Sequence, residues 1–389
     1  MIRSFHPSPP TVGVELEWQL VDRSTLDLRD GILPLAELLP DERSIKPEML
    51  QTAVETITPP CESTAILRPG LGDLVTRLVD AAARLDIALV GAGTHPFCER
   101  LVPVTPLPRY LAVERRCGYL AHTQVAYSLQ THVGMPSAEA AVRVMREVRG
   151  YLPVLLALSA SSPFFHGHQT PFGSYRQRIL AATRSCGMPP AFEDWGAFLQ
   201  FLETAERASV FGSFRDMHWD VRLRPDFGTI EVRIMDAQPT IARSLALAAL
   251  VHALLAYLAA AEPSHSSARQ LPSWIEDENA YRASQDGIEA SLISDADGTV
   301  KPVRQLAEEL FELVAPTARS LGEEEDFTRA RALLTEGPSY LEQLAVFRRT
   351  GSTRDVVREL ANELLEEVGR ARLGMEAGSE ARRSSRYGL

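Results

Sequence analysis

Carboxylate, imidazole, amide and guanidinium side chains recur at alternate positions in several short stretches of this sequence. The pairs are Glu15 and Glu17, Gln130 and His132, and Glu231 and Arg233. Side chains two residues apart on a β-strand leave the same side of the sheet, so each pair shares one face. Magnesium ions take oxygen ligands, usually one or two carboxylates plus phosphate oxygens, and arginine holds phosphate through paired hydrogen bonds. Together these faces have the chemistry of a magnesium–nucleotide site.

The alternative is that these faces are the solvated outer side of an antiparallel sheet, which is the commoner explanation for any one strand. Lys and Thr, the usual residues of a solvated strand face, are almost absent from them. A fourth such face, over residues 217–224, carries His218, Asp220, Arg222 and Arg224, and four such strands in one chain favour a functional face.

Glu48 and Glu55 form a further acidic pair, seven residues apart. On a helix, seven residues are two turns, so both side chains would share a face. On a strand they would point to opposite faces. Both can serve one site only if a helix or a bend lies between them.

The elements that must position these residues are predicted from apolar periodicity. Alternation predicts strands over residues 11–21, 123–134, 217–224 and 229–235, and an apolar run predicts another over 87–90. Turn residues at Pro225–Gly228 join two of these strands as a hairpin. Helical spacing predicts helices over 71–85, 138–160 with a break near 150–153, and 192–208, and a helical pattern follows Ile241 with breaks at 262–272 and 295–298. Amphipathic antiparallel strands with many helices indicate the α+β class.

We expect a single catalytic domain over residues 1–375 and a flexible tail over 376–389, because no linker or repeat interrupts the pattern. A hydrophobic content of 45% in 389 residues is ordinary for a soluble protein, and a net charge of −11 argues against a nucleic-acid partner. Ser244–Ala261 contains His252 and predicts a buried helix rather than a membrane span. With no apolar run at the amino terminus, the expected location is the cytoplasm, with no membrane partner.

Several common motifs are absent from the sequence: the phosphate-binding P-loop, the dinucleotide fingerprint, the H-E-x-x-H zinc motif and the G-x-S-x-G nucleophile motif. The four cysteines are far apart without a C-x-x-C pair, which indicates reduced thiols. Gly91–Gly93 is too short for a phosphate loop and predicts a turn at a strand end. His95 is expected to be a structural histidine.

The motifs resemble those of the bacterial carboxylate–amine ligases of the second glutamate–cysteine ligase type. They are T-V-G-V-E-L-E-W at 11–18, G-T-H-P-F at 93–97, L-Q-T-H-V-G at 129–134, W-D-V-R at 219–222, F-G-T-I-E-V-R-I-M-D-A-Q at 227–238 and E-N-A-Y-R at 278–282. Their order and spacing match from Thr11 to about Leu365. The resemblance therefore covers nearly the whole chain.

That resemblance implies a six-stranded antiparallel sheet of glutamine synthetase type, with helices on its outer side and ATP and Mg²⁺ on its concave polar face. It implies metal-binding carboxylates at Glu15, Glu17, Glu48, Glu55 and Glu231. Arg233 would hold nucleotide phosphate, with Arg222 as a second candidate, and Glu231 and Arg233 would be the catalytic pair. His132, Arg176 and Arg282 occupy motif positions that would line the substrate or nucleotide pocket.

One position departs from the family pattern. The bacterial group usually has H-V-H-V-G where this chain has Gln130-Thr131-His132-Val133-Gly134, and the first histidine is expected to be a metal ligand. Gln130 keeps an oxygen donor that Mg²⁺ accepts, and distant plant-type relatives carry a similar glutamine. The substitution puts metal affinity and substrate choice in question.

The resemblance implies an ATP-dependent ligase that joins a carboxylate, with glutamate as a candidate, to an amine through an acyl phosphate, releasing ADP and phosphate. No covalent enzyme nucleophile is required, since positioning and electrostatics suffice. The alternatives are a guanidino kinase-like phosphotransferase, which would release no free phosphate, and a degenerate nucleotide-binding protein without turnover. A homodimer is expected from the resemblance alone.

Overall fold

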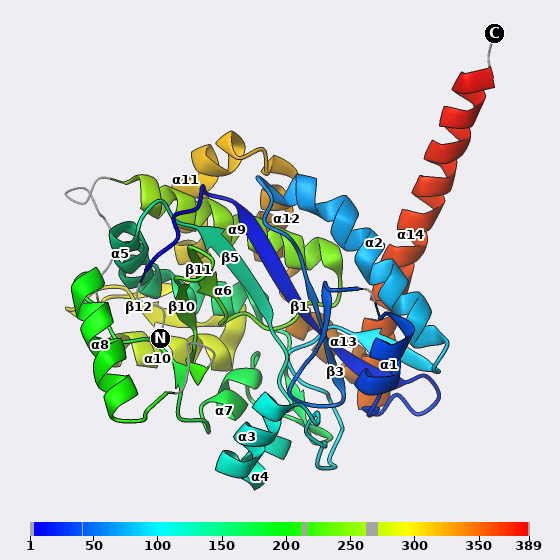
Figure 1. Cartoon of the computed structure of the whole chain (residues 1–389), viewed down its shortest axis with the longest axis horizontal. Coiled ribbons are helices and arrows are strands. Elements are labelled where there is room, and N and C mark those ends of the chain that lie inside the picture. The colour runs from blue at the N-terminus through cyan, green and yellow to red at the C-terminus, as the bar shows by residue number, and fades with distance from the viewer. Residues whose placement is uncertain (1–3, 41, 212–215, 262–270, 388–389) are drawn as a thin grey trace.

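A seven-stranded antiparallel sheet lies at the centre of the computed structural model, which describes residues 4–40, 42–211, 216–261 and 271–387. In order across the sheet, the strands are β10 (Val221–Arg224), β11 (Thr229–Val232), β5 (Leu129–Gly134), β1 (Val12–Asp22), β3 (Ala53–Ile57) and β2 (Ile45–Pro47). A seventh strand, β4 (Ile87–Val90), pairs with the second half of β1. The long β1 and its neighbour β5 cross the middle of the molecule (Figure 1).

The register of the sheet places the polar residues of neighbouring strands beside one another. The opposed pairs are Glu15 with Gln130, Glu17 with Glu55, and His132 with Glu231. Residues directly opposite in an antiparallel pair have Cβ atoms about 5 Å apart. Polar side chains from four strands therefore meet on one face.

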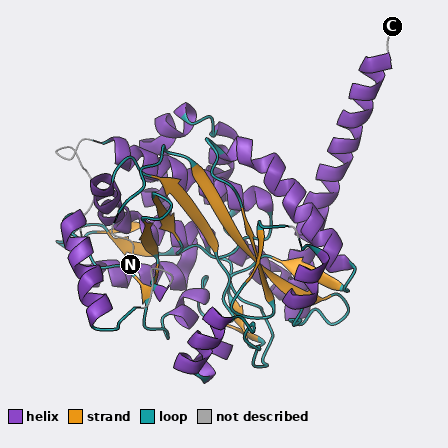
Figure 2. Cartoon of the chain, in the orientation of Figure 1, coloured by secondary structure: helices purple, strands orange, loops and turns teal. Residues whose placement is uncertain are grey.

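The other face of the sheet packs on helices. Val14, Leu16, Trp18 and Leu20 of β1 alternate with the polar residues and are buried in the main core. Helices α5 (Ala138–Val148), α6 (Leu152–Ser159) and α9 (Ile241–Ala260) contribute to this core, and helices surround the strands in Figure 2. The period-two pattern of β1 thus separates an apolar core from a polar site.

Helix α9 is the one helix of the described residues that combines the length and the apolar composition of a membrane span. It is long and apolar enough to cross a membrane, but 78% of its most apolar window is buried inside the protein. It packs against β1, β5 and several other helices. Helix α9 is apolar on all its faces because neighbouring elements bury it, as predicted for a core helix.

The remaining helices and short strands complete the chain. The helices are α1 (Ile32–Leu38), α2 (Thr64–Ala83), α3 (Pro108–Cys117), α4 (Tyr119–His122), the 3₁₀ turn Arg149–Tyr151, α7 (Arg176–Leu180), α8 (Trp195–Arg207), α10 (Ser273–Asp286), the 3₁₀ turn Gly287–Glu289, α11 (Val303–Ser320), α12 (Glu324–Glu336), α13 (Ser339–Thr350) and α14 (Thr353–Tyr387). Two-stranded pairs are β6 (Phe164–Phe165) with β7 (His168–Gln169), β8 (Cys186–Gly187) with β9 (His218–Trp219), and β12 (Ser291–Ile293) with β13 (Val300–Pro302). In Figure 1, α14 extends away from the body of the molecule.

The hairpin predicted at Pro225–Gly228 is confirmed, and its turn depends on Gly228. This residue has a φ of +68°, a conformation that side chains with a Cβ rarely adopt. A Cβ at this position would also lie 1.6 Å from the carbonyl oxygen of His6. The amino-terminal segment therefore passes directly against the turn that joins β10 to β11.

Several predicted elements differ from the structure. Only residues 129–134 of the predicted strand 123–134 are a strand, because Tyr127 bonds to the carbonyl of Gly93 instead of to β1. The predicted strand 217–224 is divided at Asp220, since β9 pairs with β8 and β10 pairs with β11. Residues 291–302, predicted to be helical apart from a break, contain the β12–β13 hairpin.

The count of strands in the sheet also differs from the six that the resemblance implied. The seventh, β4, pairs with the edge of β1 that β5 leaves free beyond Leu16.

Helix α2 begins at Thr64, seven residues before the predicted start, because the side chain of Ser63 accepts a hydrogen bond from the N–H of Ile66 and caps the helix there. The predicted break at 262–272 falls largely on residues 262–270, outside the described residues. The proposed domain and tail limits at 375 remain predictions.

Candidate active site

The polar face of the sheet gathers the predicted carboxylates from strands that are distant in the sequence. Glu15 and Glu17 lie on β1, Glu55 on β3 and Glu231 on β11. Glu48 follows β2 directly, and the bend between β2 and β3 turns it toward the face that Glu55 occupies. The bend required for that pair to serve one site is therefore present.

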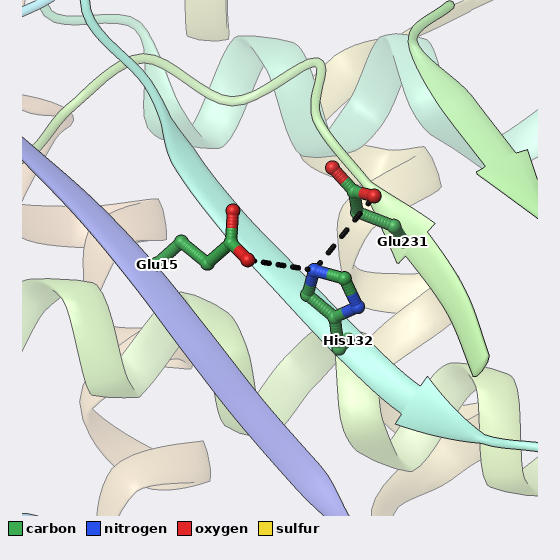
Figure 3. A group of neighbouring side chains, drawn as sticks. All are labelled: Glu15, His132 and Glu231. Atoms are coloured by element: carbon green, nitrogen blue, oxygen red, sulfur yellow. Dashed lines mark ion pairs between the residues drawn. The ribbon is translucent and has the colours of Figure 1, made fainter. Parts of the chain in front are cut away.

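Glu15, His132 and Glu231 form a first group of ligand atoms, which lie within 4.8 Å of one another (Figure 3). His132 Nε2 is 3.3 Å from Glu15 Oε1 and 3.7 Å from Glu231 Oε2. It is buried and makes no hydrogen bond in the described structure. Nδ1 of the same ring lies 3.1 Å from the hydroxyl of Thr229. With the proton on Nδ1 and donated to Thr229, Nε2 keeps a lone pair that faces both carboxylates.

Glu231 is fully buried and is bound by three arginines. Arg222 donates to both carboxylate oxygens at 2.8 and 3.0 Å, Arg224 donates at 3.2 Å, and Arg233 donates to Oε1. Burial alone would raise the pKa of Glu231, but the charges of Arg222 and Arg233 hold it well below its usual value. The carboxylate therefore stays ionised in spite of its burial.

Glu17, Glu48 and Glu55 form a second group. Burial, followed by repulsion from Glu17, raises the pKa of Glu48 to about 7. Burial and the charges of Glu48, Glu15 and Glu17 raise the pKa of Glu55 well above its usual value. Like charges this close oppose one another's ionisation, and a bound cation would remove that repulsion.

Gln130 and Arg233 connect the two groups. The amide nitrogen of Gln130 donates to Glu17 Oε1 at 2.7 Å, and its oxygen accepts a hydrogen bond from Arg233, an orientation that follows from the network. Ser128 also holds Glu17, through its N–H at 2.6 Å and its hydroxyl at 2.8 Å. Neighbouring Glu231 raises the pKa of Arg233 against the effect of burial, so the guanidinium remains charged.

Two predicted pocket residues lie elsewhere. Arg176 is 4% exposed and donates to the backbone carbonyls of Arg233 and Ile234, so it contacts the strand end rather than the polar face. Arg282, on α10, pairs with Glu278 at 2.7 Å and lines a separate cavity of about 460 Å³. The described contacts join neither side chain to the carboxylate groups, and their roles in binding remain predictions.

Three residues that contact the site were not predicted from the sequence, although the two-residue repeat of a strand places each of them on the same face as a predicted residue. Ser128 shares a face with Gln130, Thr229 shares one with Glu231, and Arg224 shares one with Arg222. The prediction for His95 is confirmed. Its Nδ1 accepts from the N–H of Cys98 at 3.0 Å, its Nε2 lies 3.0 Å from the carbonyl of Leu26, and the ring is fully buried.

The antiparallel sheet, with two acidic groups on its polar face linked by an arginine, and a match to a family model define the class of the chain as a glutamate–cysteine ligase-like carboxylate–amine ligase. The chain belongs to glutamate–cysteine ligase family 2, whose family model matches residues 11–359. It is accordingly an ATP-dependent ligase, as the resemblance implied.

Relatives of known sequence extend over nearly the same length. A provisionally named glutamate–cysteine ligase 2 of Trichormus variabilis is 41% identical over 372 residues, which cover 94% of this chain and 95% of the relative. A relative with the same provisional name from Thermobifida fusca is 34% identical and covers 93% of each chain.

Two solved structures share the fold at low sequence identity. The glutamate–cysteine ligase of Francisella tularensis in complex with AMP matches with a TM-score of 0.65 at 14% identity, over 99% of this chain and 96% of that one. A bifunctional glutathione synthetase from Pasteurella multocida matches with a TM-score of 0.62 at 12% identity, over 92% of this chain and 52% of that one. At these identities the likeness establishes a shared fold.

Proposed function

We propose that this chain is an ATP- and Mg²⁺-dependent carboxylate–amine ligase that forms an amide through an acyl phosphate and releases ADP and phosphate. The observation that carries the proposal is the position of Arg233. Its guanidinium contacts Glu231 of one acidic group and, through Gln130, Glu17 of the other. An arginine between two candidate metal sites suits a triphosphate, whose charge is shared between Mg²⁺ and arginine during phosphoryl transfer.

Both acidic groups fit divalent cations. In the tautomer with its proton on Nδ1, His132 would offer an Nε2 lone pair to the first site beside Glu15 and Glu231, and the second site has three carboxylates whose mutual repulsion a cation would relieve. Glu17 retains lone pairs beyond those used by Ser128 and Gln130. When bound, Mg²⁺ would neutralise phosphate charge and orient ATP.

The chain's own residues would act by position and charge. Arg233 would stabilise the charge that develops on the γ-phosphoryl group, while Arg222 and Arg224 keep Glu231 ionised and oriented. An oxygen of the substrate carboxylate attacks the γ-phosphorus and ADP leaves. The amine nitrogen then attacks the acyl carbon, phosphate leaves, and the nitrogen loses a proton to give the amide.

The substrates are a small carboxylic acid and an amine. The names of the relatives contain glutamate and cysteine, so these two are the first candidates. The proposal extends to other pairs, because the residues assigned above recognise phosphate and metal rather than the acid or the amine.

The decisive experiment measures ADP and phosphate release from Mg–ATP with panels of acids and amines, together with the mass of the product. The expected result is stoichiometric ADP, phosphate and amide for at least one pair. Glu231→Gln should reduce this turnover by about a hundredfold or more, as loss of a preorganised charge at a reacting phosphate does. Glu324→Gln, at an exposed ion pair on α12, serves as the control.

Two outcomes would contradict the proposal. ADP release without phosphate would indicate a phosphotransferase of the guanidino kinase kind. Full turnover by Glu231→Gln, or no stimulation by any acid–amine pair, would remove the ligase assignment for this site.

A further inference from the structure

The segment that carries Arg233 is held by hydrogen bonds to its backbone. Arg176, on α7, donates from Nη1 to the carbonyl of Ile234 and from Nη2 to the carbonyl of Arg233, both at 3.1 Å. Gln177 also donates to the carbonyl of Ile234, at 2.9 Å. The N–H of Arg233 donates to the carbonyl of Asp220 at 2.8 Å. Both backbone polar groups of Arg233 thus have fixed partners outside β11.

Asp236 supports Arg176 in turn. Its carboxylate is fully buried, lies 3.9 Å from Arg176 Nη1, and accepts hydrogen bonds from the N–H of Ser161 (2.9 Å), the hydroxyl of Ser162 (2.7 Å) and the hydroxyl of Ser174 (2.8 Å). These three hydrogen bonds and the nearby charge of Arg176 compensate the burial of the carboxylate. The network joins the segment before β6, the segment before α7 and the end of β11 into one support.

The burial of Arg176 indicates that it supports the backbone of Arg233 and does not bind the nucleotide itself. Arg176 is 4% exposed and both of its terminal nitrogens are engaged by backbone carbonyls, whereas the guanidinium of Arg233 reaches Gln130 and Glu231 on the polar face. Catalytic groups lose much of their effect when displaced by about 1 Å. A support for the backbone of Arg233 therefore acts on the site without touching the nucleotide.

We infer that Arg176 and Asp236 are positioning residues that hold Arg233 where it meets the phosphates of ATP. The inference rests on the proposed function of Arg233. It assigns Arg176 to the support of the site instead of to the pocket lining that the motif resemblance implied.

Calorimetric titration with Mg–ATP and with AMP tests the inference without requiring the substrates. Arg176→Met should weaken Mg–ATP binding about tenfold or more, the effect of losing a charge-assisted hydrogen bond. Binding of AMP, which lacks the phosphates that Arg233 would hold, should stay nearly unchanged. Arg176→Lys, which retains a charge and can reach one carbonyl, should recover part of the loss.

A double-mutant cycle tests whether Arg176 acts through Arg233. In an Arg233→Lys background, Arg176→Met should cause almost no further loss of Mg–ATP affinity, because the guanidinium that it positions is gone. The matched control is Arg178→Met on the same helix, whose guanidinium lies over the ring of Tyr281 and which should leave Mg–ATP binding unchanged. Additive losses for Arg176→Met and Arg233→Lys would overturn the inference.

Failure of this inference can be distinguished from failure of the proposed function. If Arg176→Met selectively weakens Mg–ATP but the native protein turns over no acid–amine pair, the positioning role stands and the ligase proposal falls. If the native protein is a ligase and the two losses add, the positioning role falls alone. Should Arg176→Met fail to fold, Arg176→Lys and Ser174→Ala decide, and native-like Mg–ATP affinity in both would refute the positioning role.

Discussion

The side-chain amide of Gln130 connects the two acidic groups of the site. Its nitrogen donates to Glu17 and its oxygen accepts from Arg233. An amide can donate at one end and accept at the other without a change of charge. Gln130 therefore binds Glu17 and Arg233 at the same time.

Replacing Gln130 with methionine keeps a similar length and removes both contacts. We expect the KM for Mg–ATP to rise about tenfold, because Arg233 and Glu17 each lose a charge-assisted hydrogen bond. Steady-state kinetics with a productive acid–amine pair measure the change. Gln305→Met, at an exposed position on α11, is the control and should behave as the native enzyme. An unchanged KM would show that the bridge does not hold Arg233.

We expect His95 to make the stability of the folded protein depend on pH in the acidic range. Burial lowers the pKa of His95 to about 4, and its Nδ1 accepts hydrogen bonds from the N–H groups of Phe97 and Cys98, which protonation would break. A depressed histidine pKa gives stability that is complete above the unfolded value of about 6.5 and is lost as the pH falls toward 4. The difference in the pKa of His95 between the folded and unfolded states should lower the free energy of unfolding by about 3 kcal/mol over that pH range.

Urea unfolding at several pH values tests this prediction. His95→Asn should be less stable than the native protein at pH 7, since it loses buried hydrogen bonds. It should nevertheless show a flatter pH dependence between about 6.5 and 4, because no buried imidazole remains to be protonated. Parallel pH profiles for the two proteins would contradict the assignment.

The sequence alone predicts which side chains share a strand face, but it does not predict what approaches from outside the strand. Period two was enough to group Glu15 with Glu17, and Glu231 with Arg233. Arg176 and Asp236 meet only because distant segments pack together, and no local spacing reports that contact. The raised pKa values of Glu48 and Glu55 likewise arise from neighbours that the bend after β2 brings together.

At the scale of elements, the alternation of apolar and polar residues predicts that one face of a strand is buried, but it does not predict which strand pairs with it. It predicted β1 and the β10–β11 hairpin, because in these elements one apolar face packs on the core, while β4 was predicted from its apolar run. It overextended β5, since the alternation continues back to residue 123 although Tyr127 bonds to the loop at Gly93, and it merged β9 with β10 although they belong to different sheets. Partner choice depends on tertiary approach, which a single strand does not encode.

The turn between β10 and β11 supplies a prediction at this scale. Gly228→Ala introduces a Cβ at a φ of +68° and into the carbonyl of His6, so it should destabilise the protein by about 2–4 kcal/mol. The control is Gly298→Ala, also at positive φ (+87°) but with no atom within 4 Å of the added Cβ. It should cost only about 1 kcal/mol. Urea unfolding measures both, and equal effects would show that the contact with His6 is unimportant.

At the scale of the whole molecule, the acidic face links cation binding to global stability. Glu17, Glu48 and Glu55 repel one another in the folded chain, so Mg²⁺ should stabilise it, by about 2.7 kcal/mol at a hundred times its Kd. Glu55→Gln should raise the melting temperature without Mg²⁺, because it removes a buried carboxyl whose ionisation the folded chain opposes, and should reduce the further rise with Mg²⁺. Thermal unfolding with Mg²⁺ or with a chelator measures this. A Glu55→Gln protein that responds to Mg²⁺ as the native chain does would exclude Glu55 as a ligand.

The order of strands in the sheet has a consequence for synthesis of the chain. The central strand β5 pairs on one side with β1, near the amino terminus, and on the other with β11, about a hundred residues further on. Pairing over such sequence separations is slow, because loop closure precedes the contacts that reward it. The first acidic group cannot exist until Glu231 has left the ribosome, and the apolar α9 follows immediately. A growing chain therefore carries an unpaired β5 edge until β11 has been made, and an unpaired strand edge favours aggregation.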